Sequence, residues 1–253
     1  MNLGAQDLAL AGRLAGVSIT LRPGEVTAIC GPNGAGKSTL LSVLAGLLSP
    51  DSGAVQLDGA SLATMRGQDR ARILGYLPQS PEIAWDVSIE TLVSLGRIPW
   101  PDAPAGEQGE AIDAAIKAMD MDAMRHRPVS QLSGGERARA LAARVLAGRP
   151  RWLLADEPLA NLDLAHAASL VARLREQARG GVGVVLVLHD LATAMNHADR
   201  VIVLEQGRVA ADGPPHQALG EDTIATVWGI TARWLGEHGE RALSVSHLAD
   251  GAH

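Results

Sequence analysis

Residues 26–48, VTAICGPNGAGKSTLLSVLAGLL, place a glycine-rich loop between a strand-like apolar run and a helix-like run. The first run is short, apolar and partly β-branched, which is typical of a buried strand. Leucines recur at helical spacing from Ser38 to Leu48, so the loop opens a helix. Glycines let successive backbone N–H groups face inward, and a helix N-terminus adds the positive end of its dipole. The stretch therefore predicts a phosphate-binding loop in an α/β fold.

The loop at residues 31–38, GPNGAGKS, matches the pattern GxxxxGKS in full. In that pattern Lys37 reaches the β- and γ-phosphates of a nucleotide, and the Ser38 hydroxyl ligates Mg²⁺. The alternative is a glycine turn that only opens a helix. We expect the phosphates to be bound by Gly31, Pro32, Asn33, Gly34, Ala35, Gly36, Lys37, Ser38 and Thr39.

Composition sets the class of protein. The chain has 253 residues, 47% of them apolar, which suffices for one large globular domain with a subdomain. A net charge of -6 gives no electrostatic reason to bind nucleic acid or an anionic membrane surface. Cys30 is the only cysteine, so neither a disulfide nor a cysteine metal site can form. No leader or membrane span is evident, and we expect a cytoplasmic protein.

Strand and helix signals alternate along the chain. Residues 17–30 predict a hairpin that turns at Pro23 and Gly24 and feeds a buried strand. Helical patterns fill residues 82–150, interrupted by a Pro- and Gly-rich segment at 99–109, and strand signals return at 152–155, 182–188 and 200–204. This order predicts a mostly parallel sheet. We expect a core of residues 1–81 and 151–215, an inserted helical subdomain at 82–150 and a C-terminal extension at 216–253.

A pair of carboxylates follows the strand signal in residues 151–158, RWLLADEP. A carboxylate at the carboxyl end of such a strand lies where ligands bind, so Asp156 can hold Mg²⁺. Glu157 is the best candidate for the general base that polarises the attacking water. Taken alone, the pair is more often a solvated turn, and its significance comes from the phosphate loop.

Residues 131–136, QLSGGE, precede a long helical run. Ser133 and Glu136 have the spacing of a capping box, and a well-capped helix is the simpler interpretation. That interpretation leaves Gly134 and Gly135 unexplained, because glycine lowers helix propensity there. Glycines would free backbone N–H groups to approach a second phosphate site.

In order and spacing, GPNGAGKST, LSGGE, LLADEP, the following NLD and a lone histidine after an apolar strand resemble the ATP-binding cassette ATPases over residues 15–215. The resemblance implies a P-loop NTPase with a RecA-like, mostly parallel core, an N-terminal antiparallel β part and an inserted helical subdomain. It also implies ATP and Mg²⁺ as cofactors and hydrolysis of ATP coupled to transport. Two copies would pack head to tail, so that Ser133, Gly134 and Gly135 contact the γ-phosphate bound by the other copy.

Three further roles rest on the resemblance. Gln79 matches the glutamine that contacts Mg²⁺ or the lytic water, although alone it would be an exposed loop residue. His189 matches the histidine that hydrogen-bonds the γ-phosphate, although alone it would be a strand-end residue. Asp163 matches the aspartate of the loop that crosses the dimer interface.

The sequence departs from the family in its aromatic residues. Many members stack adenine on an aromatic side chain before the phosphate loop, yet residues 1–36 contain none. Arg13 could offer a guanidinium face, although a solvated arginine is the simpler interpretation. We expect weak discrimination among ATP, GTP and CTP. Ala160 replaces a usual serine and Glu136 a common glutamine, and neither change removes a catalytic group.

Residues 74–100 look like the matching segment of importer ATPases for iron-siderophores, haem and cobalamin, especially PQ followed by VSLGRIP. This resemblance implies separate membrane permease subunits, an extracytoplasmic substrate-binding protein and a location on the cytoplasmic face of the inner membrane. One rival is the ATPase of a zinc, manganese or other transporter. Another is a soluble cassette ATPase of DNA repair or translation, which would carry a long coiled coil, zinc cysteines or a second cassette.

Overall fold

The computed structural model describes residues 1–79 and 86–246. Its centre is a six-stranded sheet in the order β10 (Arg208–Gly213), β9 (Arg200–Glu205), β3 (Val26–Cys30), β8 (Gly183–Val187), β7 (Trp152–Asp156) and β6 (Leu74–Leu77). All neighbours are parallel except β10, which is antiparallel to β9. The central strands are buried on both faces, which explains their continuous apolar sequences. The mostly parallel sheet is confirmed.

The predicted hairpin at residues 17–30 is wrong. β2 (Leu14–Leu21) pairs with β1 (Leu3–Leu10), and β1 pairs with β4 (Ser52–Leu57), which continues to β5 (Ala60–Ser61) in a separate antiparallel sheet. β3 instead enters the centre of the parallel sheet. The burial patterns give the reason: β2 alternates between buried and exposed residues, whereas β3 is buried throughout. The N-terminal antiparallel β part itself is confirmed.

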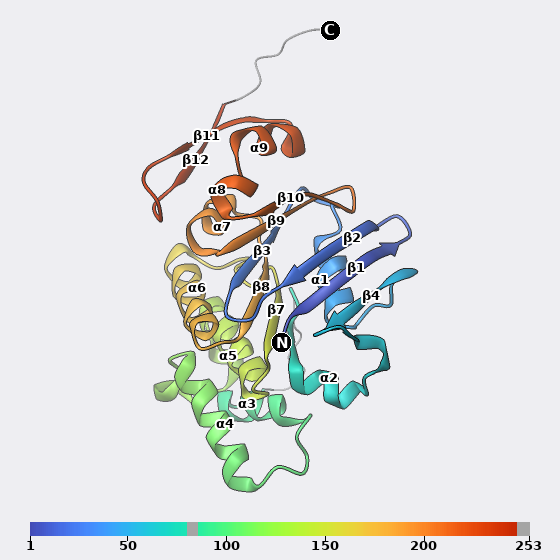
Figure 1. Cartoon of the computed structure of the whole chain (residues 1–253). Helices are drawn as coiled ribbons and strands as arrows, with labels where there is room; N and C mark the ends of the chain where they lie inside the picture. The colour runs from blue at the N-terminus through green and yellow to red at the C-terminus, as the bar shows by residue number, and fades with distance from the viewer. Residues whose placement is uncertain (80–85, 247–253) are drawn as a thin grey trace.

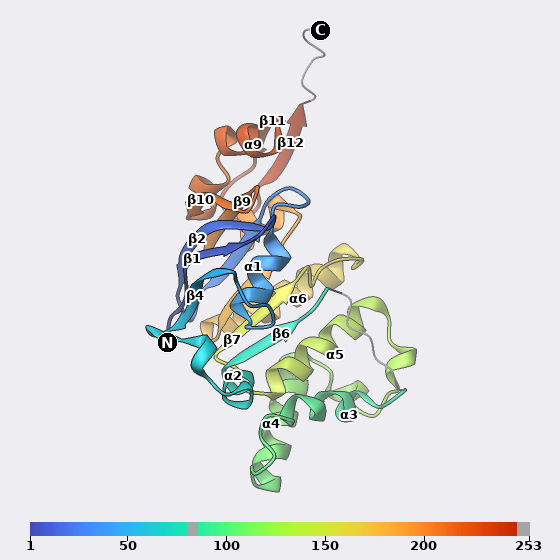
Figure 2. The same ribbon diagram turned by 90° about the vertical axis from the view of Figure 1, so that its right-hand side faces the viewer.

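Helix α1 (Lys37–Leu44) lies between the antiparallel sheet and the central sheet (Figure 2). Alternate residues of β7 pack into two different hydrophobic cores, one on each face of the central sheet. Trp152 and Leu154 pack with α1 and the antiparallel sheet, and Leu153 and Ala155 pack with the helices on the opposite face. The phosphate loop is therefore held between two layers.

The other helices cover the second face of the central sheet and one end of the molecule (Figure 1). They are α3 (Ile89–Ser94), α4 (Ala105–Ala118), α5 (Gly134–Ala147), α6 (Leu164–Arg179) and α7 (Leu191–His197). α2 (Gly67–Ile73) lies beside β6 instead, with Ile73 against the core that contains α1. α3, α4 and α5 pack together as the helical subdomain. α4 begins inside the segment predicted as an interruption, because Pro104 is its N-cap. The predicted helical start at residue 82 lies outside the described residues.

The C-terminal part forms α8 (Pro215–Ala218), α9 (Glu221–Trp228) and a hairpin of β11 (Thr231–Leu235) and β12 (Ala242–Ser246). Trp234 Nε1 donates to the carbonyl of Leu219 at 2.8 Å. The side-chain amide of Asn196 in α7 exchanges two hydrogen bonds, both 2.8 Å, with the backbone of Arg241. Residues 247–253 of the predicted extension lie outside the described part. In the described residues, no helix combines the length and apolar character that a bilayer span needs.

Candidate active site

The phosphate loop leaves β3 and enters α1. Gly36 is the N-cap of α1 with φ 98°, a conformation that favours glycine. A side chain at Gly36 would also meet the carbonyl oxygen of Arg13. The Nζ of Lys37 donates to the carbonyl oxygens of Gly31 at 2.8 Å and Pro32 at 2.9 Å. The lysine is thus positioned over its own loop.

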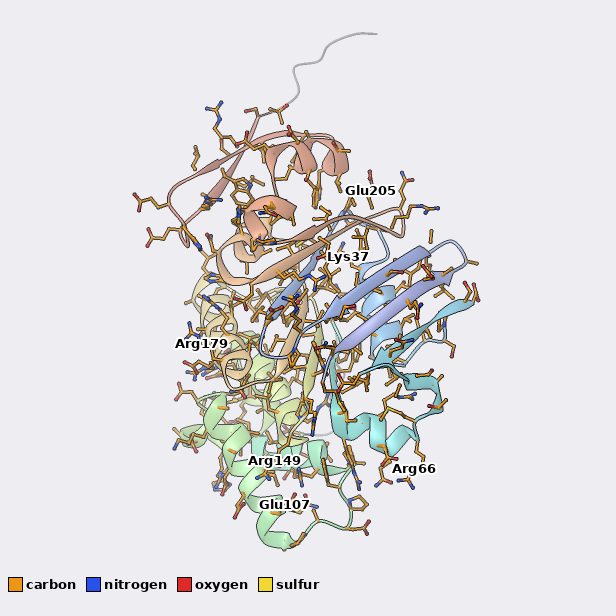
Figure 3. The ribbon with its side chains drawn as sticks, viewed as in Figure 1. Lys37, Arg66, Glu107, Arg149, Arg179 and Glu205 are labelled. Atoms are coloured by element: carbon orange, nitrogen blue, oxygen red, sulfur yellow. The ribbon has the colours of Figure 1, made fainter. Side chains whose placement is uncertain are left out.

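Lys37 is 6% exposed and lies inside the molecule, near the middle of the view in Figure 3. Burial lowers the pKa of its ammonium, and the nearby Glu157, Cys30 and Asp156 act in the opposite direction. Burial raises the pKa of the Cys30 thiol to about 12, so this thiol stays protonated at neutral pH. Lys37 is therefore the group that supplies positive charge to the loop.

Ser38 and Asp156 meet across the end of the sheet. The Ser38 hydroxyl donates to Oδ1 of Asp156 at 2.9 Å. Asp156 is 5% exposed, and burial raises the pKa of its carboxyl, although the Ser38 hydrogen bond and the Lys37 charge lower it. A hydroxyl and a carboxylate side by side are the hard oxygen donors that Mg²⁺ prefers. The donor set fits the predicted metal.

Glu157 brings three strand ends together. Its Oε2 accepts a hydrogen bond from Nε2 of Gln79, beyond β6, at 2.5 Å. Its Oε1 lies 2.5 Å from Nε2 of His189, beyond β8. Glu157 also has φ 50°, which costs a residue with a side chain about 1–3 kcal/mol. The carboxylate is thus fixed between an amide donor and an imidazole.

A cavity of about 280 Å³ opens over these groups. Among the described residues that line it there is no Phe, Tyr or Trp, and Arg13 reaches it from the turn between β1 and β2. The lining consists of Arg13, Asn33, Gly34, Ala35, Gly36, Lys37, Ser38, Thr39, Glu157 and His189. Gln79 and Asp156 adjoin it through Glu157 and Ser38.

The other predicted residues lie away from this cavity. Ser133 caps α5 in a complete capping box with Glu136, and the backbone N–H of Ser133 lowers the pKa of the Glu136 carboxyl. Gly134 lines a second cavity, of about 340 Å³, with Gln79 and Glu157. Asp163 is the N-cap of α6. None of Ser133, Gly134, Gly135 and Asp163 lines the phosphate-loop cavity.

His166 is a residue that the sequence interpretation missed. Its backbone N–H and its ring Nδ1 both contact the Asp163 carboxylate at 2.8 Å. Asp163 and His166 have the i, i+3 spacing of a capping box, with histidine in place of glutamate. This spacing is the sequence signal from which the contact between Asp163 and His166 could have been predicted.

Comparison with known proteins adds an independent observation. The sequence model described as ABC transporter matches residues 14–160. The chain belongs to this family. It is an ABC-type ATPase coupled to transport, with the mixed α/β fold of these ATPases.

Individual family members agree with this assignment. The chain is 44% identical to the hemin import ATP-binding protein HmuV of Rhodococcus jostii, over 84% of this chain and 73% of that protein. The structure of cbiO1 from Clostridium perfringens, part of the ABC transporter complex cbiONQ, gives a TM-score of 0.80 at 29% identity, covering 88% of this chain and 92% of that one. The dimeric post-hydrolysis structure of the ATP-binding cassette MJ0796, bound to ADP and Pi, gives 0.74 at 25% identity, covering 84% and 98%.

Proposed function

We propose that this protein is the ATP-hydrolysing subunit of an importer that takes up haem through a separate permease. The observation that carries the substrate class is the 44% identity to a hemin import ATP-binding protein over most of both chains. The segment at residues 74–100 supports the same class, because it resembles importers of haem, iron-siderophores and cobalamin. Iron-siderophores and cobalamin are the alternative substrates.

The site residues would have three tasks, which are to neutralise the phosphates, to bind the metal and to activate the attacking water. Lys37 and the N–H groups of residues 31–39 would neutralise the phosphates, an electrostatic and positioning task. Glu157 would accept a proton from the attacking water, and its left-handed backbone and two hydrogen bonds aim the carboxylate. His189 would donate to the γ-phosphate, and Gln79 would contact the water.

Mg²⁺ would be held by Ser38 and Asp156, with Gln79 beside them. A bound magnesium ion would neutralise charge on the β- and γ-phosphates. The protein prepares the position with the hydrogen bond between Ser38 and Asp156 and with the burial of the Asp156 carboxyl.

Two copies would form the complete site head to tail. Ser133, Gly134 and Gly135 lie outside the phosphate-loop cavity of their own subunit, so a second copy would have to bring them to the nucleotide. ATP would favour the closed dimer through contacts that exist only there. The dimeric structure of the related cassette MJ0796 supports this assembly.

A groove of about 380 Å³ between the core and the helical subdomain offers a surface for the permease. It is lined by Tyr76 of β6, Val145 of α5 and the side chains of Leu95 and Ile98. Leu95 is 39% exposed and Ile98 72% exposed, so two large apolar side chains lie open at this groove, where a protein partner would cover them. Docking there would hold the subunit at the cytoplasmic face of the inner membrane, and an extracytoplasmic binding protein would deliver the substrate to the permease.

Uptake of labelled haem tests the proposal. Cells with the parent allele are compared with cells that carry Glu157→Gln, and ferric siderophore and cobalamin uptake are measured in parallel. We expect only haem uptake to fall to the background of a deletion strain. Loss of siderophore or cobalamin uptake instead would reassign the substrate, and unchanged uptake of all three would exclude this substrate class.

A further inference from the structure

His166 joins two loops that the dimer proposed above requires. Its backbone N–H already completes the N-cap of α6 by donating to Oδ1 of Asp163 at 2.8 Å. The ring adds a second interaction, because Nδ1 lies 2.8 Å from both carboxylate oxygens. A carboxylate only accepts, so Nδ1 carries a proton and donates it to Asp163. These hydrogen bonds hold the pKa of Asp163 below its usual value.

The other side of the same ring packs on the start of α5. A Cβ atom built on Gly135 would overlap Cδ2 and Cγ of His166. Gly135 is buried even though it lies in the first turn of the helix. The imidazole can therefore lie against the start of α5 because Gly135 has no side chain. This contact explains a glycine that capping alone left unexplained.

The arrangement connects two segments that are distant in sequence. Residues 133–136 begin α5, and residues 159–163 lead into α6, yet one side chain touches both. The carbonyl oxygen of Asn161 also lies 3.8 Å from the position of a Cβ on Gly134. Neither Asp163 nor His166 lines the phosphate-loop cavity of its own subunit. The contact between Asp163 and His166 therefore acts through the two segments that it holds together.

We propose that His166 is a positioning residue that fixes the Asp163 loop to the start of α5, so that both reach the nucleotide of the partner subunit as one unit. This inference rests on the proposed head-to-tail ATPase. Loss of the ring would let the two segments move independently in the closed dimer. The rate of hydrolysis would fall, and binding of ATP to a single subunit would not change.

The first test compares replacements at position 166. His166→Asn keeps a donor near the position of Nδ1, and His166→Leu keeps apolar volume without a donor. We expect His166→Leu to lower kcat about fivefold or more with KM within about twofold, and His166→Asn to recover most of the rate. An unchanged kcat in His166→Leu, or His166→Asn as slow as His166→Leu, would overturn the proposal.

The second test is a double-mutant cycle between Gly135→Ala and His166→Ala. If Gly135 is a glycine because the ring lies on it, Gly135→Ala should cost less in kcat and in thermal stability when position 166 is alanine. An equal cost in both backgrounds would contradict the contact. The stability cycle needs no ATPase activity, so it still tests the contact if the parent protein proves not to hydrolyse ATP.

Discussion

Nε2 of His189 donates to Oε1 of Glu157 at 2.5 Å, at the ends of two adjacent strands. The Glu157 side chain is 14% exposed and the His189 side chain 48% exposed, so the imidazole is the more accessible partner of the pair. The two groups assigned to the attacking water and the γ-phosphate are therefore already in contact. Gln79 completes the arrangement from the opposite oxygen.

Replacement of His189 tests this contact. We expect His189→Gln to lower kcat by about 10²–10³-fold, because loss of one positioned hydrogen-bond donor to the reacting group costs that much. ATP affinity should change little, since Lys37 and the loop still bind the phosphates. Steady-state phosphate release and binding of a fluorescent ATP analogue measure the two quantities. His197→Gln, at the end of α7, is the matched control, and an equal loss in that variant would argue against a specific role for His189.

The buried carboxyl of Asp156 predicts a change in stability with a known sign. Its pKa is raised in the folded protein from the ordinary value of 3.8. The unfolded chain then loses this proton at lower pH than the folded protein, so the free energy of unfolding falls as the pH rises between the two pKa values. Above both pKa values, the full cost of burying the charged Asp156 carboxylate lowers the free energy of unfolding.

Asp156→Asn should therefore raise the Tm of the nucleotide-free protein at pH 7 by about 3–5 °C for each unit of pKa shift. The gain should disappear below pH 3.8, where the parent carboxyl is protonated. Stabilisation by Mg-ATP should be lost in the same variant. Differential scanning calorimetry across the pH range measures all three effects, and a lower Tm of the variant at pH 7 would reverse the assigned sign.

The lack of Phe, Tyr and Trp among the described residues that line the phosphate-loop cavity predicts weak selection of the base. KM values for ATP, GTP and CTP should agree within about tenfold, because stacking on an aromatic side chain contributes about 1–3 kcal/mol. Arg13→Trp should strengthen ATP binding, since an indole could then stack on adenine from the turn beside the loop. Competition binding measures both. A strong preference of the parent for ATP would show that another group reads the base.

Exposed Ile98 predicts where the permease binds. Ile98→Glu should abolish co-purification with the permease while the isolated subunit keeps its ATPase activity, because the groove lies apart from the phosphate-loop cavity. Leu235→Glu is the matched control, since Leu235 is 51% exposed on the C-terminal hairpin. Loss of binding in the control alone would move the docking surface to the hairpin.

The sequence predicted the elements that carry the site because each is locally encoded. The loop at residues 31–38 needs its own glycines, lysine and serine, and the strands before Asp156 and His189 are short apolar runs. Strand pairing depends on residues that are far apart in the sequence, and the pairing predicted for residues 17–30 was wrong. The turn at Pro23 and Gly24 marks a change of sheet, which the local hairpin pattern cannot distinguish from a return.

Contacts between segments that are distant in the sequence also could not be predicted from local sequence patterns. Gln79 and His189 rested on resemblance, and only the fold shows that both reach Glu157. The ring of His166 on Gly135 depends on how α6 approaches α5, which no periodicity encodes. The side chains of Asn196 and Trp234 position the C-terminal hairpin through hydrogen bonds to backbone groups. Such contacts leave no sequence motif, so the hairpin was not predicted.

The most direct test of the account is the oligomeric state of Glu157→Gln with ATP. Removal of the carboxylate should stop hydrolysis and leave the ATP-bound closed form in place, so sedimentation velocity should show a stable dimer with Mg-ATP and a monomer with ADP. A variant that remains monomeric in saturating ATP, while the parent protein hydrolyses ATP normally, would contradict the head-to-tail site.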